Sequence, residues 1–260
     1  ISIGPFSLQP SELAKIGIIL FLAAYISSKS REMRQWKKMV IPFLFAIPII
    51  VIVGIENLST CIILLAISFI MIFVATPLLV PFVVIGLIGV AGAGGLLLTQ
   101  GYRMERITVW LDPAASEKGH QTIQGLYAIG SGGLFGKGLG QSMQKLGFLP
   151  EANNDMIFSV ICEELGLFGA LCVLALFFAL IWRFMVIAVN APDLYGSMIV
   201  VGVIAHIGIQ VFINIAVATN TIPNTGIPLP FISYGGSSLV FMLLEMGLVL
   251  SVSRYINVKK

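Results

Sequence analysis

The sequence has few charged residues and few cysteines, and both shortages remove classes of protein. Only 10% of its 260 residues are charged and 58% are hydrophobic, whereas about a quarter of a soluble domain is charged. The three cysteines stand inside apolar runs without metal-ligand spacing, so they predict no disulfide framework. The chain also lacks a nucleic-acid-binding signature, a Walker motif and a signal peptide. These absences disfavour a soluble domain, an ATPase and a nucleic-acid-binding protein.

Long apolar runs, by contrast, recur along the chain. About 20 apolar residues cross a bilayer as a helix, and the pattern predicts seven spans, over 13–28, 40–55, 60–75, 82–98, 156–181, 196–218 and 237–255. The basic segment 29–38 and the basic C-terminus fall on the side that the positive-inside rule assigns to the cytoplasm. The sequence therefore predicts an all-α polytopic membrane protein, one domain over 1–260, with a large extracytoplasmic loop at 99–157.

Polar side chains inside the predicted spans are costly in lipid, so they indicate a functional interior. Glu12 and Lys15 lie three residues apart on one helix face and are expected to pair. His206, Gln210 and Asn214 fall at every fourth position and form a stripe down one helix face. Two interpretations of the stripe remain open: interhelical hydrogen bonds, or a path for protons or substrate.

Three acids are the candidates at the junction 146–169, where a polar loop meets the fifth predicted span: Asp155, Glu163 and Glu164. Asp155 stands just before the span, where the helix dipole favours the ionised form of a carboxyl group. A carboxylate there suits a general base, although an ordinary helix cap explains it equally well. Glu163 and Glu164 lie deeper, and adjacent residues do not share a helix face, so at most one of them faces a given cavity.

Cations and glycines gather in the long polar segment. The loop 125–147 holds eight glycines together with Lys137 and Lys145. Exposed main-chain amides and lysines are typical of a pyrophosphate cradle, and a turn-rich loop is the alternative. Arg103 and Arg106, three residues apart, are candidates for further anion contacts or for anchoring at the membrane interface.

Four motifs follow one another in order: QPSELAK at 9–15, IGSGGLFGKGLGQSMQK at 129–145, FLPEANNDMIF at 148–158 with EELG after it, and PLPFISYGGSS at 228–238. Together they resemble the SEDS family, the FtsW/RodA/SpoVE-type peptidoglycan glycosyltransferases, and look nearest to the FtsW cell-division branch. Many members have His-Thr where this chain has Asn153-Asn154. The resemblance implies ten transmembrane helices, so we expect a chain that lacks the first three.

The resemblance also implies an activity. It is the polymerisation of lipid II into β-1,4 glycan strands at the outer face of the bacterial plasma membrane, during cell division, with Asp155 as the general base. The pyrophosphate would be stabilised by a divalent cation (Mg²⁺ or Mn²⁺), for which no ligand is assigned, or by the four cations Lys137, Lys145, Arg103 and Arg106.

Further implications concern binding and partners. The resemblance adds the buried pair Glu12 and Lys15 to the substrate-binding residues. It implies a class B penicillin-binding protein, a transpeptidase, and other division proteins as partners. A lipid II flippase and a non-catalytic division scaffold are the alternatives, because a polytopic bundle with intramembrane charges suits a transporter as well.

Overall fold

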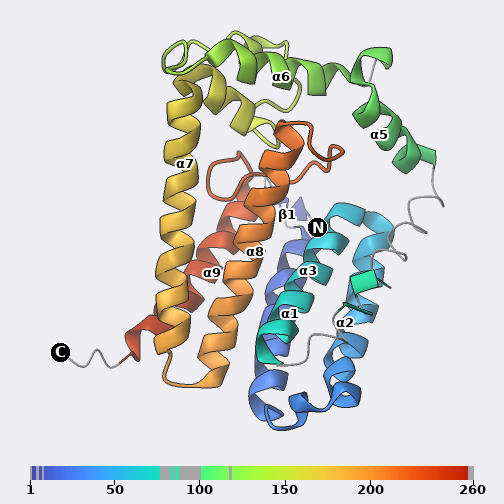
Figure 1. Cartoon of the computed structure of the whole chain (residues 1–260), viewed down its shortest axis with the longest axis vertical. Coiled ribbons are helices and arrows are strands. Elements are labelled where there is room, and N and C mark those ends of the chain that lie inside the picture. The colour runs from blue at the N-terminus through green and yellow to red at the C-terminus, as the bar shows by residue number, and fades with distance from the viewer. Residues whose placement is uncertain are drawn as a thin grey trace. The chain divides into compact units, whose positions relative to one another are not determined.

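Long apolar helices dominate the structure, a computed structural model that describes residues 2–3, 6–7, 9–76, 83–84, 86–87, 101–116 and 119–256 (Figure 1). Six of its helices are long and apolar enough to cross a membrane. They are α1 (Pro10–Ser28), α2 (Trp36–Glu56), α3 (Leu58–Ala75), α7 (Ile157–Asn190), α8 (Leu194–Ala218) and α9 (Gly236–Arg254). The helical, multi-pass prediction is confirmed, and so are six of the seven spans. The fourth predicted span, 82–98, lies largely outside the described residues.

Local chemistry explains where the first helices begin. Pro10 is the first residue of α1, a position at which its missing N–H costs nothing. Asn57 caps α3, because its side-chain oxygen accepts a hydrogen bond from the amide of Thr60 at 3.1 Å. Before α1, two short strands, β1 (Ser2–Ile3) and β2 (Phe6–Ser7), pair antiparallel. A 3-10 turn, η1 (Glu32–Arg34), lies between α1 and α2.

The long polar segment is largely helical. It contains α5 (Gly101–Leu111), a 3-10 turn η2 (Pro113–Ala115), α6 (His120–Gly132) and a second 3-10 turn η4 (Gln144–Leu146). Between α6 and α7 the chain forms the glycine-rich loop, residues 133–147, and then the acid turn, residues 148–156, which carries Asp155. The predicted loop at 99–157 is therefore an ordered structure in its described parts.

α7 is interrupted at Gly166, whose φ of 67° and ψ of −166° are not helical. The interruption leaves main-chain groups without helical partners, and the glycine-rich loop supplies them. The amides of Leu167 and Phe168 donate to carbonyls 133 and 134, at 2.9 and 3.0 Å. In return, carbonyls 163 and 164 each accept an amide of the loop at 2.9 Å. α7 also continues to Asn190, past the predicted end at 181.

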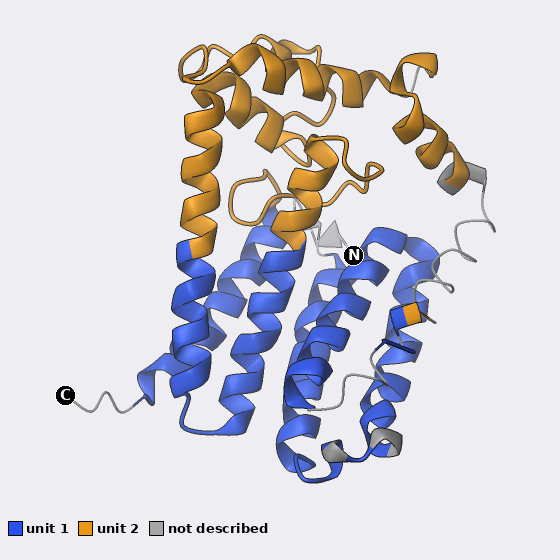
Figure 2. Cartoon of the chain, viewed as in Figure 1, with its two compact units in different colours: residues 1–86, 179–209, 236–260 blue, residues 87–178, 210–235 orange. Residues whose placement is uncertain are grey.

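Two compact units make up the chain (Figure 2). Unit 1 comprises residues 1–86, 179–209 and 236–260, and unit 2 comprises 87–178 and 210–235. The core of unit 1 includes fully buried apolar side chains of α1 and α3, among them Ile19, Leu22, Leu64 and Ile67. Unit 2 contains α5, α6 and the acid turn. The prediction of one domain over 1–260 stays a prediction.

Candidate active site

The acid turn is held in place by α8 and by the segment that follows it. Asn214, fully buried in α8, donates its side-chain amide to the carbonyl of Asp155 at 2.7 Å and to that of Ile227 at 2.8 Å. The hydroxyl of Ser233 donates to the carbonyl of Asn154 at 2.6 Å. These bonds fix the backbone on which Asp155 stands, although 59 residues separate Asp155 from Asn214.

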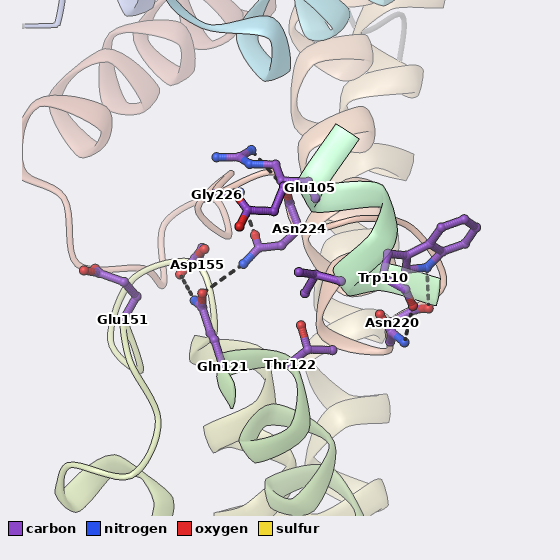
Figure 3. A pocket seen from close by; sticks show the side chains of 11 residues that line it. Glu105, Trp110, Gln121, Thr122, Glu151, Asp155, Asn220, Asn224 and Gly226 are labelled. Atoms are coloured by element: carbon purple, nitrogen blue, oxygen red, sulfur yellow. Dashed lines mark hydrogen bonds between the residues drawn. The ribbon is translucent and has the colours of Figure 1, made fainter. Parts of the chain in front are cut away.

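A pocket of about 360 Å³ opens beside Asp155 in unit 2 (Figure 3). Its wall combines side chains from α5, the start of α6, the acid turn and the loop 219–227. The lining residues are Glu105, Arg106, Val109, Trp110, Gln121, Thr122, Glu151, Asp155, Asn220, Asn224 and Gly226. Eight of these eleven residues are polar or charged, and Trp110 adds an aromatic ring. Such a wall suits a sugar or another polar ligand, which binds through hydrogen bonds and contact with a ring.

Asp155 is 8% exposed, and burial raises the pKa of its carboxyl group to about 6. The Glu151 carboxylate also raises this pKa, while hydrogen bonds from the Asp155 amide and from Gln121, and the charge of Arg106, lower it. Burial outweighs the groups that favour ionisation. A carboxyl group with this pKa is mostly ionised at pH 7, so it can accept a proton.

Arg106 is the cation that the structure brings to this pocket. Its guanidinium donates to the carbonyl of Asn224 at 3.1 Å, and its side chain is exposed. One turn further along α5, the indole of Trp110 donates to the carbonyl of Asn220 at 3.0 Å. α5 is thus tied to the loop 219–227 at two points. The side chain of Arg103 lies outside the described part of the chain.

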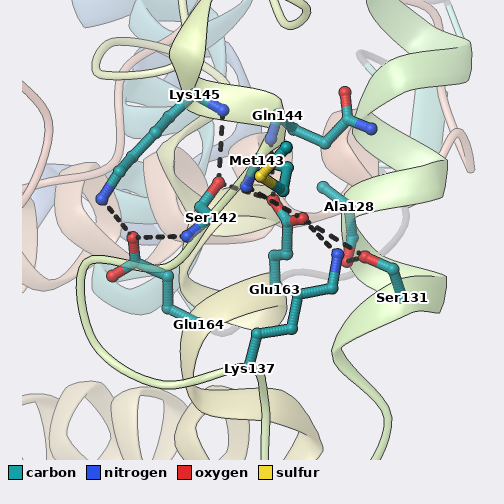
Figure 4. A network of polar contacts seen from close by, with 9 residues as sticks. All are labelled: Ala128, Ser131, Lys137, Ser142, Met143, Gln144, Lys145, Glu163 and Glu164. Atoms are coloured by element: carbon teal, nitrogen blue, oxygen red, sulfur yellow. Dashed lines mark hydrogen bonds and ion pairs between the residues drawn. The ribbon is translucent and has the colours of Figure 1, made fainter.

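The other two predicted cations pair with the two glutamates of α7 (Figure 4). Lys137 meets Glu163 at 2.7 Å, and Lys145 bonds to Glu164. Neither lysine lines the Asp155 pocket. The Glu163 side chain is fully buried and also accepts hydrogen bonds from Ser131, Ser142, Met143 and Gln144. Glu164 accepts the amides of Gly140 and Ser142 as well.

Two glycines make this contact between loop and helix possible. Gly136 adopts φ +77°, and a Cβ added there would lie 2.1 Å from the carbonyl oxygen of Glu164. A Cβ on Gly166 would lie 2.4 Å from the amide nitrogen of Gly136. The glycines at these positions are therefore explained by close backbone approach. In the structure, the loop amides and lysines bind the carboxylates of α7, and pyrophosphate binding by this loop stays a prediction.

The predicted intramembrane pair, Glu12 with Lys15, lies in unit 1. Lys15 and Glu12 form an ion pair at 2.8 Å, and both are buried, which confirms the pairing but does not test a role in substrate binding. His206 contacts both carboxylate oxygens of Glu245 at 2.9 Å. Gln210, further along the stripe and already in unit 2, donates to the carbonyl of Pro228 in the same unit at 3.0 Å. The stripe thus makes the hydrogen bonds between segments that its first interpretation predicted.

Sequence reasoning missed several residues of the pocket, above all Gln121 and Asn224. Gln121 donates to the Asp155 carboxylate at 3.4 Å, and Asn224 donates to Gln121 at 3.0 Å. Asn224 is 103 residues away from Gln121, and no periodicity or spacing connects the two. Within the described residues, no three acidic, histidine or cysteine side chains converge as a metal site requires.

The fold and the site together define a polytopic helical membrane protein with a buried carboxylate in a polar pocket, outside its membrane-spanning helices. Comparison with known proteins gives its relationship. The family profile FTSW_RODA_SPOVE, described as a cell cycle protein, matches residues 1–258. The chain belongs to the FtsW/RodA/SpoVE family.

Individual relatives agree with this assignment. Stage V sporulation protein E of Bacillus subtilis (strain 168) is 48% identical, over 98% of this chain and 71% of the relative. The probable peptidoglycan glycosyltransferase FtsW of Geobacter sp. (strain M18) is 36% identical, over 95% of this chain and 69% of the relative. The motifs predicted a nearer likeness to the FtsW branch. These two relatives do not support that prediction, because the identity to the sporulation protein, 48%, exceeds the identity to FtsW, 36%.

Solved structures show the same fold. A chain of a peptidoglycan synthase complex, studied for the coordination of polymerization and crosslinking, matches with a TM-score of 0.79 at 28% identity. That match covers 100% of this chain and 74% of the other. The rod shape determining protein RodA of Thermus thermophilus matches with a TM-score of 0.68 at 29% identity, over 98% of this chain and 69% of the other.

Proposed function

We propose that this chain is a peptidoglycan glycosyltransferase that polymerises lipid II into β-1,4 glycan strands, with Asp155 as the general base. The observation that carries the proposal is the environment of Asp155. A buried carboxyl group with a pKa near 6 lines a polar pocket that also contains the cation Arg106. A base and a cation in one pocket match the needs of glycosyl transfer from a pyrophosphate-linked donor. The name of the Geobacter relative supports the same activity.

The proposed reaction is a single displacement with inversion at the anomeric carbon. The 4-hydroxyl of the acceptor sugar attacks, its oxygen bonds to the anomeric carbon, and its proton passes to the carboxylate of Asp155. The bond between the anomeric carbon and the pyrophosphate oxygen breaks, and the pyrophosphate leaves with that electron pair. No enzyme nucleophile is needed, as in inverting glycosidases.

The negative charge that develops on the leaving pyrophosphate needs a cation nearby. Arg106 fits this role because it is exposed and lines the same pocket as Asp155. Arg103, one helical turn earlier in α5, is the second candidate. Lys137 and Lys145 would first have to leave Glu163 and Glu164. We therefore assign the pyrophosphate contact to the arginines, and the pair Glu12–Lys15 remains a proposed substrate-binding element of unit 1.

The proposal includes a location and a partner. A lipid-linked sugar reaches Asp155 if the long polar segment faces the outside of the bacterial plasma membrane, which is the orientation that the basic loops predict. The fold likeness to a chain of a peptidoglycan synthase complex supports a crosslinking partner, which we propose to be a class B penicillin-binding protein. Polymerisation is then measured both with and without that partner.

The variant Asp155→Asn tests the assignment. Because burial raises the pKa of this acid from 3.8 to about 6, the folded state loses stability as pH rises through this window. Ionisation at pH 7 then costs about 3 kcal/mol, which asparagine avoids. The variant is expected to fold at least as well as the parent chain and to lose glycan chain growth from purified lipid II. Normal chain growth by Asp155→Asn would refute the proposal.

Two further assays with the parent chain and Asp155→Asn separate the alternatives. A flippase would move labelled lipid II across a proteoliposome membrane without lengthening it. A scaffold would support cell division with Asp155→Asn in place. The enzyme assignment would be wrong if either result were obtained and the parent chain, tested with its partner, also showed no glycan chain growth.

A further inference from the structure

A chain of amide groups leads from the loop 219–227 to the Asp155 carboxylate (Figure 3). The amide of Gly226 donates to the side-chain oxygen of Asn224 at 2.9 Å. The side-chain nitrogen of Asn224 donates to the oxygen of Gln121 at 3.0 Å, and the nitrogen of Gln121 donates to Oδ1 of Asp155 at 3.4 Å. In this series of hydrogen bonds, the side-chain amides of Asn224 and Gln121 each accept through the oxygen and donate through the nitrogen.

This order of donors fixes the orientation of the Gln121 amide. A carboxylate only accepts hydrogen bonds, so the group that faces Asp155 has to be an NH₂ group. Asn224 enforces that choice, because its own NH₂ group already occupies the oxygen of Gln121. Asn224 is held in turn by the main-chain amide of Gly226, which no rotation of a side chain can reverse.

The two oxygens of Asp155 have different surroundings. Oδ1 is held by Gln121, whereas no other residue in the described ranges donates a hydrogen bond to Oδ2. Oδ2 lies toward Gly226, where an added Cβ would come within 3.9 Å of it, and Gly226 lines the pocket with φ +67°. Because Gln121 occupies Oδ1 and not Oδ2, Oδ2 is the oxygen placed to receive a proton.

Other charged groups also face Asp155. Glu151, from the same turn, and Arg106, from α5, act on its ionisation in opposite directions. Glu105 lines the pocket as well. Within the described structure, none of these three side chains hydrogen-bonds to the carboxylate of Asp155. Among the side chains of the described structure, Gln121 is therefore the one that orients this carboxylate by a hydrogen bond.

We infer that Gln121 and Asn224 are positioning residues of the active site: Gln121 holds Oδ1 so that Oδ2 takes the proton of the attacking hydroxyl, and Asn224 sets the direction of the Gln121 amide. This inference rests on the proposed function, in which Asp155 is the base. The hydrogen bond from Gln121 stabilises the ionised carboxylate, so its loss reduces the fraction of active base at a given pH. It also releases the carboxylate from its fixed orientation.

The test measures lipid II polymerisation against pH for the full chain with its transpeptidase partner. Gln121→Leu is expected to lower kcat by about tenfold or more and to leave KM nearly unchanged. The acid limb, which is the part of the pH–rate profile where activity falls as pH decreases, is expected to move to higher pH by roughly one unit. Gln124→Leu makes the same chemical change three residues along α6 and outside the pocket. It is expected to keep the parent kcat and the parent acid limb.

A second variant guards against loss of folding in the first. Asn224→Asp keeps the size of the side chain and the acceptor for Gly226, but it presents no donor to Gln121. The Gln121 amide then turns its NH₂ group toward residue 224 and its oxygen toward Asp155. The acid limb is expected to move upward in this variant too, with the fold retained in thermal unfolding.

The outcomes separate the two hypotheses. If Asp155→Asn abolishes chain growth while Gln121→Leu and Asn224→Asp keep the parent kcat and acid limb, the positioning role is wrong and the base assignment stands. If Asp155→Asn polymerises normally, the base assignment itself fails. An acid limb that moves in both positioning variants, but not in Gln124→Leu, supports the inference, because a purely structural defect would lower activity at every pH.

Discussion

Replacing Glu163 by glutamine exchanges one acceptor oxygen for an NH₂ donor at the centre of the network in Figure 4. One carboxylate oxygen accepts from Lys137, Ser131 and Met143, and the other accepts from Ser142 and Gln144. Glutamine therefore leaves one of these two groups of donors facing another donor, whichever way its amide turns.

The cost follows from the burial of the partners. A hydrogen bond to a charged group contributes about 1.5–3 kcal/mol, and a buried donor without a partner costs about 1–3 kcal/mol. Lys137 is 36% exposed and regains water when it loses its partner, which reduces the total. We expect Glu163→Gln to destabilise the closed loop by about 3 kcal/mol, which raises the opening constant of the loop about 100-fold.

Trypsin provides the assay, because Lys137 and Lys145 lie in the glycine-rich loop and cleavage requires the loop to open. When opening and closing are fast relative to cleavage, the rate follows the opening constant. Cleavage after these lysines, measured by mass spectrometry on the membrane-embedded chain, should be about 100-fold faster in Glu163→Gln. Glu56→Gln, at the exposed last residue of α2, serves as the control. Cleavage of Glu163→Gln within twofold of the parent rate would refute the reasoning.

Two further predictions concern the pH dependence of activity and the buried pair of His206 and Glu245. Since the pKa of Asp155 is raised to about 6, chain growth from lipid II should be half-maximal near pH 6 and fall about tenfold per pH unit below it. A rate that stays constant between about pH 5 and 7 would contradict this prediction. Glu245→Gln should lower the free energy of unfolding by about 3–5 kcal/mol, because the buried contact of His206 with both carboxylate oxygens is broken. The double variant with leucine at both positions should recover most of this loss in thermal unfolding, and a single variant as stable as the parent would contradict the argument.

The membrane architecture was predictable because it depends on local composition. Apolar runs identify spans without knowledge of their neighbours, and the pairing of Glu12 with Lys15 follows from their spacing on one helix. The ends of the spans were less predictable, as α7 shows. It continues to Asn190 because an apolar helix can extend beyond the width of the hydrocarbon core.

The candidate site was predictable only in part, because its contacts join distant segments. Asp155 stood out as an acid beside an apolar run, and Arg106 as a cation near the same loop. Lys137 and Lys145 resembled an anion cradle because their partners in α7 lie 26 and 19 residues away. A single sequence carries no signal for such pairings. The burial that raises the pKa of Asp155 likewise depends on the three-dimensional surroundings of the turn.

The interruption of α7 at Gly166 also affects the order in which this region can form during synthesis. The glycine-rich loop leaves the ribosome before residues 163–168, which supply its two carboxylates and its backbone partners. Until then, its lysines and amides have only water as a partner. Neither segment completes its hydrogen bonds without the other, so both are expected to become ordered in one cooperative step. The loop that precedes Asp155 thus reaches its final conformation only after the helix that follows Asp155 has been made.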